Sequence, residues 1–207
     1  MNDGKLNPVI DFINTLCSFF VLNFVFLITC IPVFTIGSAL SSLYYVMAKE
    51  TKGEYGYLVR TFLREFGRNL KNGTAAFLLL FTAGILLLFN LLFWPVQGTV
   101  LGAAVTGLLA ALSAVWLAIC HYTFPLIGRF VNTPLRSVKN AWELALRNLK
   151  RTLVLLLTDA LTACLCLFLP LGTVVAAWLS VGFVLMAYWQ SFVLNKVLEP
   201  YETGERR

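Results

Sequence analysis

An aspartate and a histidine inside apolar runs are the residues of this chain whose types and spacing could do chemistry. Asp159 is the only acidic residue within a long apolar run, and His121 is the only histidine of the chain. An ionisable group in a bilayer costs several kcal/mol unless it is paired or hydrated. His121 precedes Arg129 by eight residues and Asp159 follows Arg151 by eight. Both therefore lie about 12 Å from the same face, and we expect Asp159 to meet His121, or a nearby Asn or Tyr.

This pair has two interpretations. It can tie helices together through hydrogen bonds worth about 1 kcal/mol each, or it can line a polar cavity that binds a solute. Catalysis is the least favoured role. Further polar residues within the apolar runs more often tie helices than bind a solute; they are Asn23, Asn90 and Gln190.

Patterns typical of enzymes and metal sites are absent from the sequence. It has no Gly-x-x-x-x-Gly-Lys loop, no Gly-x-Ser-x-Gly elbow and no His-Glu-x-x-His. The cysteines lie in apolar runs without Cys-x-x-Cys spacing, which favours buried free thiols over disulfides or zinc; they are Cys17, Cys30, Cys120, Cys164 and Cys166. We expect neither an enzyme nor a cofactor.

The elements that position these residues are membrane helices. The chain is 59% hydrophobic and 13% charged, against about 25% charged in soluble domains. A span needs about 20 apolar residues, and no linker divides the chain. We predict one all-α membrane domain over 1–207, a polytopic bundle with spans near 12–31, 75–93, 101–128, 153–169 and 174–194. The net charge of +6 is best explained by topology signals, so no nucleic-acid partner is expected.

The stretch after the first span predicts a break. Pro32 removes a backbone donor, Thr35 follows, and Gly37 permits unusual dihedral angles, so this turn should interrupt the helix near a membrane face. Residues 38–49 then predict a helix of about 18 Å, too short to cross. We expect it to be interfacial or partly inserted.

Two basic amphipathic helices are predicted on the cytoplasmic side. Residues 57–71 and 135–150 each alternate basic and apolar positions at helical spacing, and each ends in Arg-Asn-Leu-Lys before a span. The repeated ending leaves open an internal duplication of 12–96 and 101–198. The basic residues can bind anionic lipid headgroups or a protein partner; they are Arg60, Arg64, Arg68, Lys71, Arg136, Lys139, Arg147 and Lys150.

The distribution of Lys and Arg predicts the orientation. Six lie in 49–71 and six in 129–151, whereas the turns at 94–99 and 170–173 contain none. The basic segments at 49–72 and 129–151, and the C-terminus, should therefore be cytoplasmic. Five spans place the N-terminus outside, and a re-entrant 32–49 segment would reverse it.

Residues 32–72 also carry a resemblance to a known family. The Pro-Val-Phe-Thr-Ile-Gly turn, the Leu-Tyr-Tyr helix and the segment Thr-Phe-Leu-Arg-Glu-Phe-Gly-Arg-Asn-Leu-Lys-Asn resemble the YesL family of bacterial integral membrane proteins. The resemblance implies no biochemical activity and no catalytic residue. It implies a context, because such proteins tend to be encoded beside carbohydrate-uptake transporters and polysaccharide-degrading enzymes in Gram-positive bacteria.

Three functions follow as expectations. The first is a non-enzymatic accessory subunit in the bacterial cell membrane, in contact with a carbohydrate transporter's permease or ATPase subunit. The second is a solute channel or carrier acting alone, which would use Asp159, His121 and the broken first region. The third is a membrane sensor or regulator. The sequence sets no oligomeric state.

Overall fold

The computed structural model describes residues 8–54 and 56–202, with the backbone alone for 8–12, and this part of the chain consists of helices joined by short connections. No strand occurs within those ranges. A 3₁₀ turn, η1, covers Val33–Thr35, and a π-helical turn, η2, covers Trp178–Gly182. The α-helices are α1 (Pro8–Cys30), α2 (Ile36–Glu50), α3 (Leu58–Val96), α4 (Val100–Arg129), α5 (Pro134–Arg147), α6 (Leu149–Phe168), α7 (Leu171–Ala177) and α8 (Phe183–Glu202).

Five helices of the described ranges are long and apolar enough to cross a membrane. They are the segment Ile13–Cys30 of α1, then α3, α4, α6 and the continuous helix Leu171–Glu202 that α7, η2 and α8 form together. The predicted all-α polytopic fold is confirmed. The turns predicted at 94–99 and 170–173 are present but shorter, because the non-helical connections between the long helices cover only 97–99 and 169–170.

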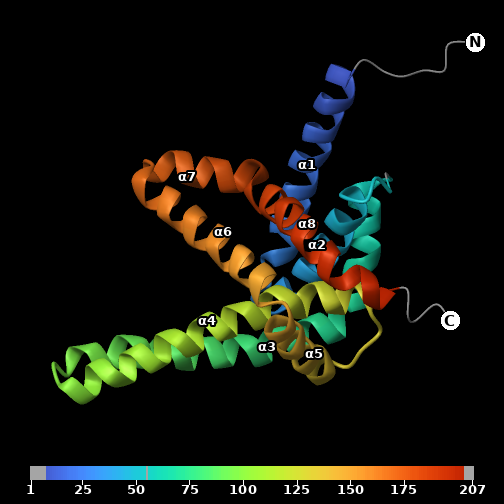
Figure 1. Cartoon of the computed structure of the whole chain (residues 1–207). Coiled ribbons are helices and arrows are strands. Elements are labelled where there is room, and N and C mark those ends of the chain that lie inside the picture. The colour runs from blue at the N-terminus through green and yellow to red at the C-terminus, as the bar shows by residue number, and fades with distance from the viewer. Residues whose placement is uncertain (1–7, 55, 203–207) are drawn as a thin grey trace, which may run out of the picture.

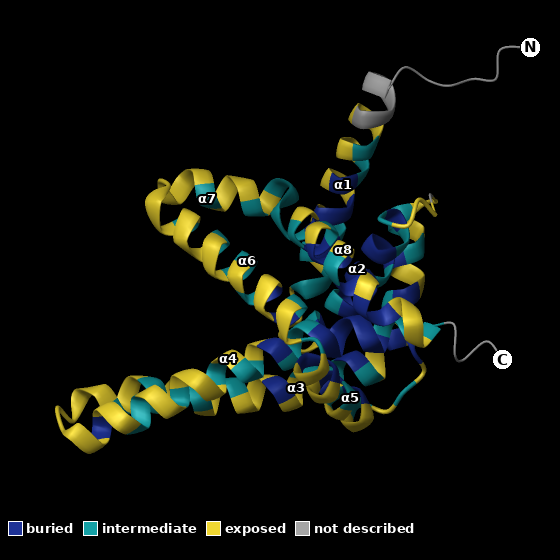
Figure 2. Cartoon of the chain, in the orientation of Figure 1, coloured by how far each residue is buried: buried dark blue, intermediate teal, exposed yellow. Residues whose placement is uncertain are grey.

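Two helical hairpins diverge from a common base. Figure 1 shows the pair α3–α4 running one way and the pair α6–α7 another, while the start of α1 points in a third direction. Figure 2 shows buried residues concentrated at the base, where α2 and α8 meet the ends of α3 and α4, and exposed residues along the hairpins. Exposed leucines are expected where lipid replaces water as the solvent.

The helix predicted over 38–49 is present and is largely enclosed by protein. It is α2, which packs against α3, α4 and α8, with Ser38, Ser41 and Ser42 fully buried. Small residues allow this close packing. A Cβ built on Gly128 of α4 would lie 2.4 Å from the carbonyl oxygen of Ser41.

The predicted break after the first span is present, although Gly37 contributes differently from the expectation. The η1 turn follows Pro32, and the Thr35 hydroxyl donates to the carbonyl oxygens of Thr29 and Pro32 at 2.6 Å each. Gly37 does not adopt a positive φ. Its hydrogen side chain instead lets α2 approach α3, where Gly73 lies opposite.

The amphipathic segment 57–71 is not a separate surface helix. It forms the first part of α3, whose 39 residues continue unbroken into the span, because an isolated Gly73 does not stop a helix. The second predicted amphipathic segment, 135–150, does form a helix separate from the span that follows. This helix is α5, which ends at Arg147, and Asn148 after it is non-helical, with φ −119° and ψ 44°. The internal duplication stays a prediction.

Candidate functional site

Four polar side chains form a hydrogen-bonded chain that joins four helices. His121 Nε2 of α4 bonds Asp159 Oδ2 of α6. The other carboxylate oxygen, Oδ1, accepts from Gln190 Nε2 of α8 at 2.9 Å, and Gln190 Oε1 accepts from the Tyr44 hydroxyl of α2. We call these residues the polar tetrad. The expected contact between Asp159 and His121 is therefore present.

The polar tetrad is largely withdrawn from the surface. Gln190 is 2% exposed and Tyr44 9%, and the side chains of His121 and Asp159 are 12% and 29% exposed. Both oxygens of Asp159 and both ends of the Gln190 amide are engaged, so the carboxylate is compensated as an intramembrane acid must be. Chemically, the arrangement can hold a proton between imidazole and carboxylate while it fixes α4, α6 and α8 to α2.

Tyr44 is the member of the tetrad that sequence reasoning missed. It lies within the segment expected at the interface, where a tyrosine commonly meets headgroups. The signal that could have identified it is the run of small residues on α2, which includes Ser38, Ser41 and Ser42, because small residues mark helices that pack closely inside membrane proteins.

Asn23 lies outside the tetrad and supports the π-helical turn. Its amide nitrogen donates to the carbonyl oxygens of Trp178 and Leu179, at 3.1 and 2.9 Å, and its oxygen accepts from the Val184 amide at 3.3 Å. A π-turn interrupts the regular helical hydrogen bonds, and the fully buried Asn23 supplies the missing partners. Its position gives it a structural role.

Asn90 also lies apart, and its contacts are local to α3. It donates to the carbonyl oxygen of Leu86 at 2.8 Å, and its own oxygen accepts from the Trp94 indole at 3.4 Å. Of the predicted interior residues, the structure thus brings together Asp159, His121 and Gln190, and separates Asn23 and Asn90 from them.

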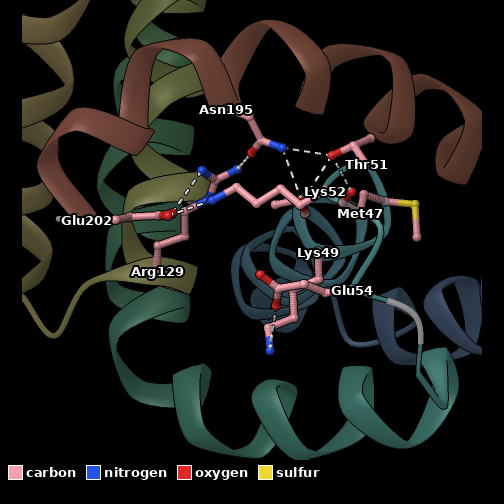
Figure 3. A network of polar contacts seen from close by, with 9 residues as sticks. Met47, Lys49, Thr51, Lys52, Glu54, Arg129, Asn195 and Glu202 are labelled. Atoms are coloured by element: carbon pink, nitrogen blue, oxygen red, sulfur yellow. Dashed lines mark hydrogen bonds and ion pairs between the residues drawn. The ribbon is translucent and has the colours of Figure 1, made fainter.

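A second polar network joins the ends of α2, α4 and α8 (Figure 3). The Arg129 side chain, 4% exposed, donates to Glu202 at 3.2 Å and to Asn195 at 2.5 Å. Lys52 donates to the other oxygen of Glu202 at 2.6 Å. The Asn195 amide nitrogen donates to the Thr51 hydroxyl at 2.8 Å. Sequence reasoning used Arg129 only as a topology signal and missed this network.

The eight predicted docking residues divide into two groups. On α3, Arg64 and Arg68 lie 3.2 and 3.9 Å from the buried carboxylate of Glu65. The remainder make no ion pair within the described ranges; they are Arg60, Lys71, Arg136, Lys139, Arg147 and Lys150. All eight are exposed. The α5 helix and the Lys71 end of this α3 segment are adjacent, because the Asn72 amide donates to the Asn132 carbonyl at 3.2 Å.

Metal-ligating residues do not cluster in this part of the chain. Across residues 8–54 and 56–202, no three His, Cys, Asp or Glu side chains come together in a group that could hold a metal ion. The five cysteines are free thiols.

Comparison with known proteins gives one family match. Residues 19–91 match the model of a family described as "Protein of unknown function, DUF624". The match covers about a third of the 207 residues, from α1 to most of α3, and includes η1 and α2. No curated protein and no solved structure matches the chain.

Proposed function

We propose that this chain is a non-enzymatic partner subunit of a bacterial carbohydrate-uptake system. The observation that carries the proposal is the divergence of the two hairpins from one base (Figure 1). Their surfaces are apolar and exposed, for example at Leu88, Leu112 and Leu161. Helices of a membrane bundle gain stability by packing along their lengths, so diverging hairpins suit a protein that packs against the spans of another.

The carbohydrate part of the proposal rests on the sequence. Residues 32–72, which resemble the YesL family, fall within the matched stretch 19–91. The resemblance supplies the genomic context of sugar transporters, and the family match supplies no activity. The partner that fits this context is a permease or ATPase subunit.

We place the protein in the bacterial cell membrane with the basic segments 49–72 and 129–151 in the cytoplasm. Their Lys and Arg content supports this orientation through the positive-inside rule. The six basic side chains without an ion pair are then available to an acidic surface of a cytoplasmic subunit or to anionic lipid. Four of the six belong to α5 and the residues just after it.

Co-purification tests the proposal. The full-length tagged chain is extracted from its native membranes in mild detergent, and we expect a transporter permease or ATPase at stoichiometric amount. Gln replacements at Arg136, Lys139, Arg147 and Lys150 should abolish this association. The matched control replaces Arg64 and Arg68, which already contact Glu65, and should retain it. Recovery of the chain without transporter subunits would reject the proposal.

A solute carrier acting alone is the second candidate. The observation that favours it is the Asp159–His121 contact, because ionisable residues inside membrane helices often mark proton or solute pathways. Liposomes that contain the purified chain would then take up solute, and Asp159→Asn would stop uptake without reducing the amount of folded protein. Absence of uptake, together with co-purification of a transporter, supports the partner role instead.

A further inference from the structure

A cavity of about 400 Å³ opens beside the second polar network, between the end of α2, the loop after it and the ends of α4 and α8. Three basic side chains line it, Lys49, Lys52 and Arg129, against two acidic ones, Glu54 and Glu202. The lining thus carries one more positive than negative charge. Glu199, one helical turn before Glu202, is not among the lining residues.

The inner charges of the cavity are held in place. Glu202 contacts both Arg129, at 3.2 Å, and Lys52, at 2.6 Å. The Arg129 guanidinium is buried, and its Nε has no hydrogen-bond partner among the described residues. Within the lining one carboxylate therefore faces two cations, while Glu199 also acts on Arg129 from outside the cavity. Lys49 is the remaining cation that can attract a further anion.

The more exposed ion pair of the cavity, between Lys49 and Glu54, is easily broken. Lys49 and Glu54 lie 3.5 Å apart with side chains 41% and 58% exposed, and exposed ion pairs of this kind contribute about 0–1 kcal/mol. An anion that enters the cavity can replace Glu54 at Lys49 at little cost. Figure 3 shows this pair on one side and the Arg129–Glu202–Lys52 contacts on the other.

Aromatic residues shape the rest of the wall. The Lys49 ammonium lies 5.3 Å from the centre of the Tyr45 ring, and Phe130 also lines the cavity. A phosphate oxygen is a stronger acceptor than a neutral group and pairs readily with lysine, while the rings suit a short carbon backbone attached to it.

We propose that this cavity binds the phosphate of a small organic ester or of a phospholipid headgroup. Lys49 is the cation that exchanges Glu54 for the phosphate, and Lys52 and Arg129 supply the surrounding positive potential. The site is separate from the α5 surface assigned to a protein partner, so either proposal can fail without the other.

Titration calorimetry on the full-length chain in a neutral detergent tests the site. The probes are glycerol 3-phosphate, dihexanoyl phosphatidic acid and, as a zwitterionic control, dihexanoyl phosphatidylcholine, all at matched ionic strength. Saturable binding of glycerol 3-phosphate identifies a small ester as sufficient. Binding of phosphatidic acid alone identifies the lipid headgroup as the source. Binding of neither, or equal binding of phosphatidylcholine, overturns the proposal.

Three variants locate the site. Lys49→Gln should weaken binding about tenfold, the effect of losing one hydrogen bond to a charged group. Glu54→Gln should strengthen it, because the competing carboxylate is gone. Lys196→Gln, an exposed lysine of α8 that does not line the cavity, is the matched control and should leave the affinity unchanged. Unchanged binding in Lys49→Gln, or an equal loss in Lys196→Gln, overturns the assignment even if a phosphate binds.

Discussion

Gly37 of α2 and Gly73 of α3 meet backbone to backbone. A Cβ built on Gly37 would lie 2.1 Å from the Gly73 carbonyl oxygen, and one built on Gly73 would lie 2.6 Å from the Ser38 backbone. Neither position has room for a methyl group, and the nearest obstructing atom in each case belongs to the main chain. This contact holds α2 against α3 at the base from which the hairpins diverge.

Gly73→Ala should therefore destabilise the protein by about 1–3 kcal/mol or more, the usual cost of overpacking. The measurement is the unfolding midpoint in detergent. Gly67→Ala is the matched control on the same helix, because nothing lies within 4 Å of a Cβ there. The control should be neutral or stabilising by up to about 1 kcal/mol. Equal behaviour of the two variants would contradict the close contact.

The polar tetrad predicts energetic coupling between His121 and Asp159. A double-mutant cycle with His121→Leu and Asp159→Leu should give a coupling energy of about 0.5–2 kcal/mol, since hydrogen bonds between membrane helices fall in this range. Equilibrium unfolding in mixed micelles measures it. A control cycle of Asp159→Leu with Asn90→Leu should be additive within about 0.5 kcal/mol, because Asn90 bonds only within α3. Additivity in the first cycle would show that the contact does not stabilise the fold.

In the second polar network, removal of the Glu202 charge should destabilise the protein more than removal of the Lys52 charge. Glu202→Gln leaves the buried Arg129 cation without a counter-charge in the network and should cost about 3 kcal/mol. Lys52→Gln leaves Glu202 paired with Arg129 and should cost less than about 1 kcal/mol. Thermal unfolding of both variants at one detergent concentration gives the comparison. A larger loss in Lys52→Gln would show that Lys52, rather than Arg129, is the main partner of Glu202.

Glu50, the last residue of α2, should make the stability of the protein depend on pH. Burial raises the pKa of its carboxyl above the ordinary value. The folded state then binds a proton more tightly than the unfolded state, so this group favours folding most below its unfolded pKa and progressively less as the pH rises through the folded pKa. At neutral pH, Glu50→Gln should be more stable than the unmodified chain.

The test for Glu50 is the difference in unfolding midpoint between the two proteins across the acidic to neutral range. This difference cancels the other carboxyl groups, which both proteins share. It should grow with pH and level off above the folded pKa. A difference that is constant with pH would contradict a raised pKa.

Hydropathy and helical spacing predict the long elements of this fold because lipid imposes a simple rule on sequence. A span must be apolar over about 20 residues, and each of the five predicted spans matches one of the five long helices, although those at 12–31 and 153–169 extend one residue past the end of the helix. The depth argument for Asp159 and His121 succeeds for the same reason: each is counted along a regular helix from a charged residue, and a regular helix has a fixed rise.

Tertiary packing explains what the sequence does not predict. Glycine and serine on α2 could equally mark a turn or a close contact, and only the position of Gly73 on α3 decides between them. The burial of Arg129 depends on Asn195 and Glu202, more than sixty residues away. No local sequence pattern predicts partners that lie so far apart along the chain. The sequence does not predict that α3 is continuous, because its basic first part, 57–71, and its apolar second part, 75–93, differ in composition. Both parts nevertheless belong to one helix.

The unbroken length of α3 has a mechanical consequence. Its 39 residues extend about 58 Å, whereas the hydrocarbon core of a bilayer is about 30 Å thick. No non-helical residue between Leu58 and Val96 can absorb a twist. Arg60, Arg64 and Arg68 are therefore joined to Trp94 by one continuous helix, and a displacement at the Trp94 end of α3 can be transmitted to them along its length.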